Sequence, residues 1–476
     1  MAGALEDAGA YHVGSIRWLS EYGTVHGSAL IVARFGFVSS WFAWSAALNH
    51  GELVGRIGTV MNGLLLLLCL GQLLVVTLRL WRKTAAAADL LVLFAWIIML
   101  PSFFGWDMRT SPSPDIPLLI FGVVIAWAML VIEPQAGSRA IDLDAALARA
   151  RLMVLLLGTG AFLIKVSGAP LLAASALYYV WAQRQGWITR CGIAALTCTA
   201  MLGVLAAAGV ISSGCAFYPS ALLCTDLPWS VGREGAQAMT EVIRQFARGN
   251  LDQPQLQGPA LIMAWIRSNA DSTRWMVLSI IAGAWLLLRR SQLNVAGLGW
   301  ASMIGFIGLP FLLLTAPAGR FGTTYIIILP LLVLVALCDS LGHLLRRIAR
   351  PATLRRMSIA ITALGVVYMA MPLYKEFIYS RLRAISYASL AHRKQGNPSL
   401  NELNARWWLV PNRYADAPGF TSARAYDFDY AMPPKTTSLC WHHALPCSYE
   451  SLAHVRLRDV KAGLSAGFVR EARVRQ

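Results

Sequence analysis

The chain has 476 residues, of which 57% are apolar and only 14% are charged. Soluble domains carry about 25% charged residues and about 45–50% apolar ones, so this composition excludes an ordinary soluble protein. The formal net charge is +17. Its Lys and Arg residues cluster between apolar runs, which argues against nucleic-acid binding and fits membrane topology and anionic head groups. We therefore expect an all-α polytopic membrane protein.

Apolar runs long enough to cross a membrane recur along the chain. A helix of about 20 apolar residues crosses the ~30 Å hydrocarbon core. One of the expected spans is short and broken or tilted, because Ser167-Gly168-Ala169-Pro170 interrupts a longer run. The ten expected spans cover 56–78, 88–105, 116–133, 151–168, 169–183, 191–212, 275–290, 296–316, 322–341 and 357–374.

Basic residues concentrate in alternate connections, a pattern typical of cytoplasmic loops. The remaining segments are then external, and in a bacterium they are periplasmic, with the protein multi-pass in the inner (plasma) membrane. We expect an external loop over 1–55 with interfacial helices, a transmembrane domain over 56–374 and a small mixed C-terminal domain over 375–476, with 213–274 as a further external loop. Either a first transmembrane helix is missing from this sequence, or the short tail crosses unaided.

Two close pairs of cysteines lie on the expected external side. Cys215 is nine residues from Cys224, and Cys440 is seven residues from Cys447. An oxidising compartment makes two disulfides plausible, although spacing alone leaves free thiols open. The other cysteines lie in or near spans and read as small core residues. The neighbouring histidines lack the spacing of a zinc site, and no metal site is expected.

Ionisable residues gather at the expected external ends of the spans. Asp115 begins a span, where a carboxylate is either a helix N-cap or a functional acid, and the two roles can coexist. Lys165 lies near the end of another span, where it either extends to the interface or has a partner. An apolar stretch around Arg34 is typical of an interfacial helix. The candidate substrate-binding residues are His12, Tyr11, Arg34, Asp115, Lys165, Tyr218 and Arg320.

These residues come from five separate segments that reach one membrane face. Such a collection suits an amphipathic lipid-phosphate substrate. Cations would hold the phosphate, apolar grooves the polyprenyl chain, aromatic rings the sugar faces, and a carboxylate the acceptor hydroxyl.

Several motifs lie along nearly the whole chain. They are Asp7…Tyr11-His12…Trp18…Glu21-Tyr22-Gly23, Arg34–Phe42, Ser111–Pro117, Lys165-Val166-Ser167, Ser213-Gly214…Tyr218-Pro219, Arg320-Phe321-Gly322 and Cys440…Leu445-Pro446-Cys447…Arg456-Leu457-Arg458 with Gly467-Phe468. Together they resemble a family of little-characterised bacterial multi-pass proteins. More remotely, the architecture is similar to the GT-C glycosyltransferases.

The GT-C resemblance implies an inverting glycosyltransferase with a polyprenyl-phosphate-linked sugar as donor. The acceptor would be a cell-envelope glycan, lipid or protein. In those enzymes an acidic residue of the first external loop is the catalytic base, which places Asp7 in that role and Glu6 as the second candidate. Lys165, Arg320 and Arg34 would neutralise the departing phosphate. No cofactor is required, although a divalent cation (Mg²⁺ or Mn²⁺) could bridge Asp7 and the phosphate.

Two other functions stay open. A surface-polysaccharide polymerase or ligase would rely on external Arg and His residues rather than on a first-loop carboxylate. A transporter of lipid-linked sugars often has internal repeats and charges near the middle of the membrane, and the sequence has neither. In the C-terminal segment, Arg406-Trp407-Trp408 and Trp441-His442-His443 could contact sugars, but packing onto the rest of the protein is the expected role.

Overall fold

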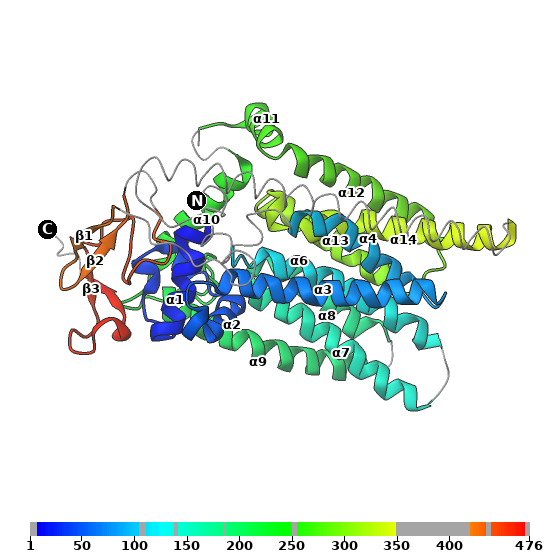
Figure 1. Ribbon diagram of the computed structural model, residues 1–476, viewed down its shortest axis with the longest axis horizontal. Coiled ribbons are helices and arrows are strands. Elements are labelled where there is room, and N and C mark those ends of the chain that lie inside the picture. The colour runs from blue at the N-terminus through cyan, green and yellow to red at the C-terminus, as the bar shows by residue number, and fades with distance from the viewer. Residues whose placement is uncertain are drawn as a thin grey trace, which may run out of the picture.

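The structure is a computed structural model that describes residues 7–103, 111–137, 141–183, 186–249, 255–348, 419–434 and 439–471. Long helices run side by side along the longest axis, and short helices and strands cover one end of them (Figure 1). We call that end the capped end and the opposite one the bare end. The α-helices are α1 (Val13–Tyr22), α2 (Ser40–Leu48), α3 (Ile57–Trp81), α4 (Ala87–Phe103), α6 (Asp115–Ile132), α7 (Ile141–Ile164), α8 (Ala169–Trp181), α9 (Trp187–Ser213), α10 (Gly232–Arg248), α11 (Gly258–Ser268), α12 (Ala270–Arg289), α13 (Leu298–Thr315) and α14 (Thr323–Ile348).

Short helical turns connect these helices and build much of the cap. The first of them, η1, is a single turn of π-helix, and the others are 3₁₀ turns. They are η1 (Ala8–His12), η2 (Ser28–Leu30), η3 (Ala33–Gly36), η4 (Gly51–Leu53), η5 (Glu133–Gly137), η6 (Val166–Gly168), η7 (Arg290–Gln292), η8 (Gly319–Phe321) and η9 (Gly463–Ala466).

Six helices among the described residues are long and apolar enough to cross a membrane, and they match six of the ten expected spans. These stretches are Val60–Trp81, Asp115–Gln135, Ala146–Ile164, Trp187–Ser213, Leu298–Thr315 and Thr323–Ser340. The expected spans 88–105 and 169–183 correspond to the shorter apolar helices Ala87–Met99 and Val166–Trp181. The expected span 275–290 lies within α12, and 357–374 lies outside the described residues.

The centre of the bundle is formed by α6 and α14. In their apolar stretches 72% and 61% of the residues are buried, against 11% in α3 and 17% in α9. The outer helices therefore present Leu-rich faces to the surroundings, as lipid-facing helices do. Gly122 of α6 lies directly against Thr324 of α14, where a Cβ atom would overlap the threonine side chain. This close approach places the start of α14 beside the start of α6.

The expected break in the fourth and fifth spans is present. Helix α7 ends at Ile164, Lys165 is extended (φ −158°, ψ 137°), and α8 begins after the turn η6 with a proline in its first turn. The freed backbone oxygens find partners: Ser39 Oγ donates to Ile164 O (2.6 Å), and Tyr325 Oη donates to Ser167 O (2.6 Å). Irregular backbone inside a bundle is stable only when it is hydrogen-bonded in this way.

The cap is one hydrophobic cluster made of segments far apart in the chain. Buried residues of 7–61 share it with Cys215, Tyr218 and several residues of 425–468. The described part of the C-terminal segment contains two antiparallel hairpins, β1 (Thr421–Arg424) with β2 (Asp429–Met432) and β3 (Val455–Leu457) with β4 (Phe468–Arg470). The small mixed region that the sequence predicts thus packs on the first segment of the chain.

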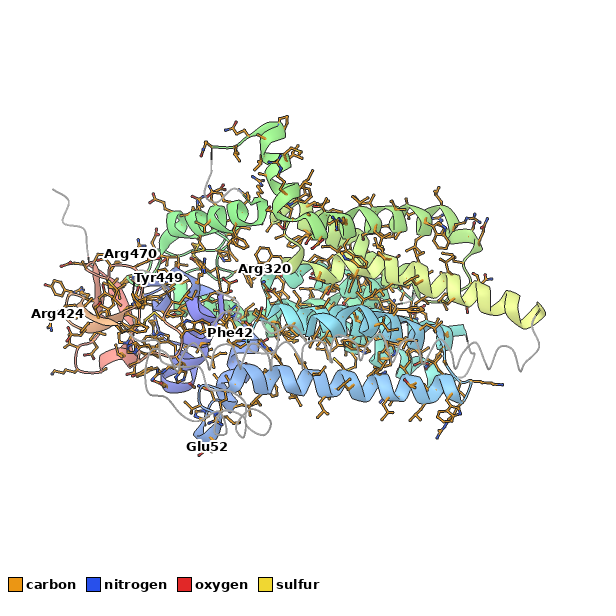
Figure 2. The ribbon with its side chains drawn as sticks, turned by 45° about the horizontal axis from the view of Figure 1, so that its top comes forward. Phe42, Glu52, Arg320, Arg424, Tyr449 and Arg470 are labelled. Atoms are coloured by element: carbon orange, nitrogen blue, oxygen red, sulfur yellow. A yellow bond between two sulfur atoms is a disulfide. The ribbon has the colours of Figure 1, made fainter. Side chains whose placement is uncertain are left out.

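Both cysteine pairs are disulfides and lie in this capped end. Cys215 is bonded to Cys224, and Cys440 is bonded to Cys447. Backbone bonds also tie the hairpins to the first segment, since Phe468 N–H donates to His26 O (2.8 Å). Figure 2 shows Phe42 and Arg320 at the junction of cap and bundle, whereas Arg424 lies far out on the hairpins.

Candidate functional site

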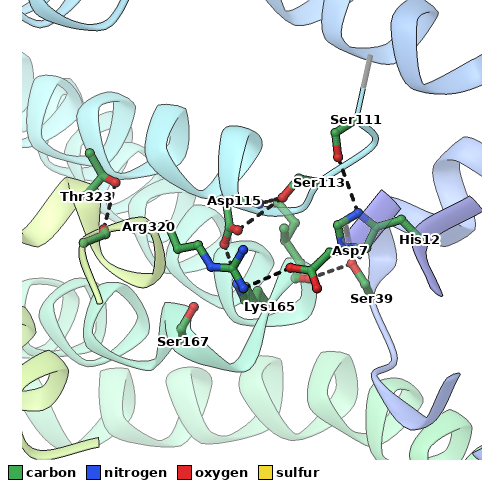
Figure 3. Close-up of polar contacts among 12 residues, drawn as sticks. Asp7, His12, Ser39, Ser111, Ser113, Asp115, Lys165, Ser167, Arg320 and Thr323 are labelled. Carbon is green, nitrogen blue, oxygen red and sulfur yellow. Dashed lines mark hydrogen bonds and ion pairs between the residues drawn. The ribbon is translucent and has the colours of Figure 1, made fainter. Parts of the chain in front are cut away.

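Asp7 lies between two arginines at the junction of cap and bundle. Its carboxylate is ion-paired with Arg320 (Nη2 to Oδ2, 2.9 Å) and accepts a hydrogen bond from Arg34 Nη1 through Oδ1 (3.3 Å). The residue precedes η1, and its side chain makes no capping bond to that helix. The two guanidinium groups come from η3 and η8, so three separate segments meet at this carboxylate. Figure 3 shows the Arg320 guanidinium beside Asp7, with Lys165 and Asp115 next to it. Glu6, the second candidate base, lies outside the described residues.

A second ion pair joins Lys165 and Asp115. Lys165 Nζ donates to Asp115 Oδ1, so the lysine has a partner and does not extend alone to the interface. The alternative that Asp115 caps its helix is wrong. Pro114 holds the N-cap position, and Ser113 Oγ accepts from the Asp115 N–H (3.3 Å) while donating to the carboxylate (3.2 Å). The Asp115 side chain is therefore oriented toward the lysine.

The two ion pairs belong to one site, because both act on the buried His12. Burial lowers the pKa of His12 most, the nearby charges of Lys165, Arg320 and Arg34 also lower it, and Asp115 opposes them; together they bring it from 6.5 to about 3. His12 Nδ1 lies 3.5 Å from Ser111 Oγ. The imidazole is thus neutral at pH 7 and serves the site as an uncharged hydrogen-bonding group.

An aromatic wall separates the charged residues from the interior of the cap. The Tyr11 ring lies 5.6 Å from the Phe37 ring and 6.3 Å from the Phe42 ring. The Arg34 guanidinium lies 5.9 Å from the Tyr11 ring. Burial raises the Tyr11 pKa, so its hydroxyl keeps its proton. Tyr218 is one layer further in, with its ring 5.6 Å from Phe37. Among the predicted binding residues, Tyr218 thus supports the aromatic wall from behind.

Two phenylalanines cover the cations on another side. The Arg320 guanidinium lies 4.5 Å from the Phe246 ring and 4.9 Å from the Phe321 ring, and Lys165 Nζ lies 4.7 Å from the Phe321 ring. Such contacts stabilise a cation without neutralising it. Sequence reasoning missed Phe246, which α10 brings over the site. The alternation of apolar and polar residues at helical spacing in 232–248 could have indicated this amphipathic helix.

An apolar cavity of about 280 Å³ lies between the cap and α9, and none of the described residues that line it is charged. Its lining includes Phe37 and Ser39 of the cap, Leu163 near the end of α7, and Val204 of α9. Val204 is 74% exposed on the outer face of the bundle, so the cavity reaches that face. Ser39, which lines the cavity, bonds to the backbone oxygen of Ile164, the residue before Lys165. The cavity therefore opens to the surface that lipid would cover, and one of its lining residues contacts the segment that carries Lys165.

The five charged side chains carry one positive charge in excess, with three cations against two carboxylates. Their exposed fractions range from 19% for Asp7 to 37% for Arg320, so a solute can reach them. In the described part of the chain no group of three or more His, Cys, Asp or Glu side chains could hold a metal ion. Both Asp7 oxygens face guanidinium groups, and such positively charged neighbours do not fit a divalent cation. We therefore assign no step of the reaction to a metal ion.

One family model matches residues 4–327; it is described as Domain of unknown function (DUF8201). The chain belongs to this family. The matched DUF8201 residues include all five charged side chains of the site, whereas the hairpins and the Cys440–Cys447 disulfide lie outside the match. No curated protein and no solved structure matches the chain.

Proposed function

We propose that the chain is a GT-C-like glycosyltransferase that moves a sugar from a polyprenyl-phosphate donor to a cell-envelope acceptor at the outer face of the bacterial inner membrane. The observation that carries the proposal is the meeting of Asp7, Arg34 and Arg320 with Lys165 and Asp115 at the capped end, which also holds an apolar cavity. An excess cation suits a phosphate, and the cavity suits the chain attached to it.

Phosphate binding would release Asp7 for its role as base. In the structure the Asp7 carboxylate is occupied by two guanidinium groups, one hydrogen-bonded and one ion-paired, so its oxygens are not open to an acceptor hydroxyl. A donor phosphate competes for Arg320 and Arg34, whose side chains are 37% and 31% exposed. The arginines then bind the phosphate oxygens, and Asp7 becomes free to accept a proton. Base activation would thus depend on the presence of donor.

The transfer itself is a single displacement at the anomeric carbon. Asp7 removes the proton of the acceptor hydroxyl, and the hydroxyl oxygen attacks the anomeric carbon from the face opposite the phosphate. The bond between that carbon and the phosphate oxygen breaks, and polyprenyl phosphate leaves with the electron pair. Lys165 and the two arginines stabilise the charge that develops on the leaving phosphate. Configuration at the anomeric carbon is inverted.

The test is release of the lipid carrier by purified protein in proteoliposomes that contain a synthetic polyprenyl-phosphate-linked sugar together with cell-envelope glycolipids as acceptors. We expect free polyprenyl phosphate and a glycosylated acceptor in equal amounts. Asp271→Asn is a matched control, because Asp271 is 93% exposed in a surface pair with Arg274. Movement of intact donor across the bilayer without release would indicate a transporter. Use of pyrophosphate-linked oligosaccharide alone would indicate a polymerase or ligase.

A further inference from the structure

The loop closed by the Cys440–Cys447 disulfide contacts the short helix that follows Asp7. Trp441 N–H donates to Gly9 O (2.9 Å), two residues after Asp7. The Trp441 ring lies on the same glycine so closely that a Cβ at position 9 would stand 2.5 Å from ring atom Cε2. Trp441 itself is 8% exposed. The loop therefore touches both the backbone and the open face of η1.

A second contact comes from the next helix. Arg17 Nη1 donates to His442 O (2.7 Å) and His443 O (2.6 Å), the two residues after Trp441. Arg17 belongs to α1, which continues directly from η1. The disulfide loop thus contacts both η1 and α1, at two points that lie eight residues apart on one helical segment.

The helical turn that the loop contacts is a π-turn. A π-turn closes its backbone bonds at wider spacing than an α-helix, and such turns are rare and occur mostly at functional sites. Here Val13 N–H bonds to Ala8 O, and the Gly9 carbonyl accepts a bond from the disulfide loop. A glycine is needed there because only a residue without a side chain admits the Trp441 ring.

We propose that the Cys440–Cys447 loop is a positioning element for Asp7, with Trp441 as the positioning residue. The inference rests on the proposed role of Asp7 as base. Trp441 does not touch the Asp7 carboxylate; it acts through Gly9 and η1. A displacement of about 1 Å in a catalytic group costs up to about 10²-fold in rate. A segment outside the DUF8201 match thus completes the site within it.

The decisive variants are Trp441→Ala and Trp441→Phe, with Ser448→Ala as a matched control. Ser448 Oγ donates to Ile31 O (2.8 Å), so its variant weakens a different contact between the same two regions. For Trp441→Ala we expect faster hydrogen exchange across residues 8–12 and a kcat lowered by about 10–100-fold, with KM changed less than about 2-fold. Trp441→Phe keeps a ring on Gly9 and should restore most of both properties.

A double Cys440→Ser, Cys447→Ser variant tests the loop as a whole and should raise exchange in the same residues. Unchanged exchange in 8–12 for both the Trp441→Ala and the double variant would overturn the positioning role, as would an equal kcat loss in Ser448→Ala. Hydrogen exchange is measured without substrate. A wild-type protein that transfers no sugar therefore overturns the proposed function alone, and the exchange result still decides whether the loop holds η1.

Discussion

The two ends of the helix bundle carry ion pairs of similar chemistry in different surroundings. At the bare end, Arg151 Nη2 bonds to Glu133 Oε1 (3.0 Å), and Tyr178 Oη donates to the same oxygen (2.9 Å). The Arg151 side chain is 5% exposed and that of Glu133 is 16% exposed. At the capped end, Arg320 and Asp7 are 37% and 19% exposed.

The difference lies in access. At the bare end Tyr178 contacts Glu133, and Gln183 Oε1 accepts from both Arg151 and Arg190. At the capped end three cations share two carboxylates, and these side chains are 19–37% exposed. A buried group of charges joins helices, whereas an accessible group with positive charge in excess can bind an anion. Intramembrane charge alone therefore does not identify a site.

The largest expected effect is the loss of transfer in Asp7→Asn. An amide cannot take the proton of the acceptor hydroxyl, and general-base help is worth about 10²–10⁴-fold in rate. Donor binding should remain, because the cations are intact, so kcat falls while KM for the donor changes little. The measurement is kinetics of carrier release. Full activity in this variant would show that Asp7 is not the catalytic base. The charged residues at the capped end would then have a role in binding only.

Removal of Lys165 should affect donor use next most strongly. A charged hydrogen bond to phosphate is worth about 1.5–3 kcal/mol, which corresponds to about 10–100-fold in kcat/KM for the donor. Ser167→Ala, in the adjacent turn η6, is the control and should change donor kinetics little. Equal kinetics for Lys165→Ala and Ser167→Ala would show that the lysine only pairs with Asp115, as Arg151 pairs with Glu133 at the bare end.

Long-range features of the fold could be predicted because they depend on composition over many residues. Six spans follow from uninterrupted apolar runs, and the break after α7 follows from Gly168 and Pro170. The three segments assigned to one side do have their described residues at one end of the bundle (Figure 1). The span expected at 275–290 is different: polar residues in the first turns of α12 keep that helix below the apolarity of the other six.

The pairing within the site could not be predicted, because it depends on tertiary distance. Asp7 pairs with residues 27 and 313 positions away, and Lys165 with one 50 positions away. Residue types at the ends of the spans indicated which charged side chains would lie near one another. They did not indicate that both Arg34 and Arg320 would pair with Asp7. Phe246 lies on the amphipathic helix α10, and a search for continuous apolar spans does not detect such a helix.

At the bare end, Glu133→Gln should reduce stability and leave chemistry unchanged. The buried Arg151 would lose its charge partner, which costs about 1–3 kcal/mol. Glu241→Gln is the control: its pair with Arg244 is 39–47% exposed, and exposed pairs contribute about 0–1 kcal/mol. Thermal denaturation in detergent measures the first effect, and carrier release per folded molecule measures the second. If Glu133→Gln lowered kcat without lowering stability, the pair of Arg151 and Glu133 would have a role in catalysis. The two ends of the bundle would then not differ in function as we expect.

The last expected effect is a pH dependence of stability that His12 imposes on the capped end. Burial and the neighbouring cations lower its pKa from 6.5 to about 3, so below pH 6.5 the unfolded chain binds a proton that the folded protein does not take up. Folding stability is therefore full above pH 6.5 and decreases toward pH 3, with a slope of up to about 1.4 kcal/mol per pH unit from this residue. His12→Asn keeps a hydrogen-bonding group near Ser111 but does not titrate, so the denaturation midpoint should depend less steeply on pH than in the wild type. His50→Asn changes an exposed histidine and should keep the wild-type slope. An unchanged slope in His12→Asn would mean that His12 takes up its proton in the folded protein, which the three neighbouring cations oppose.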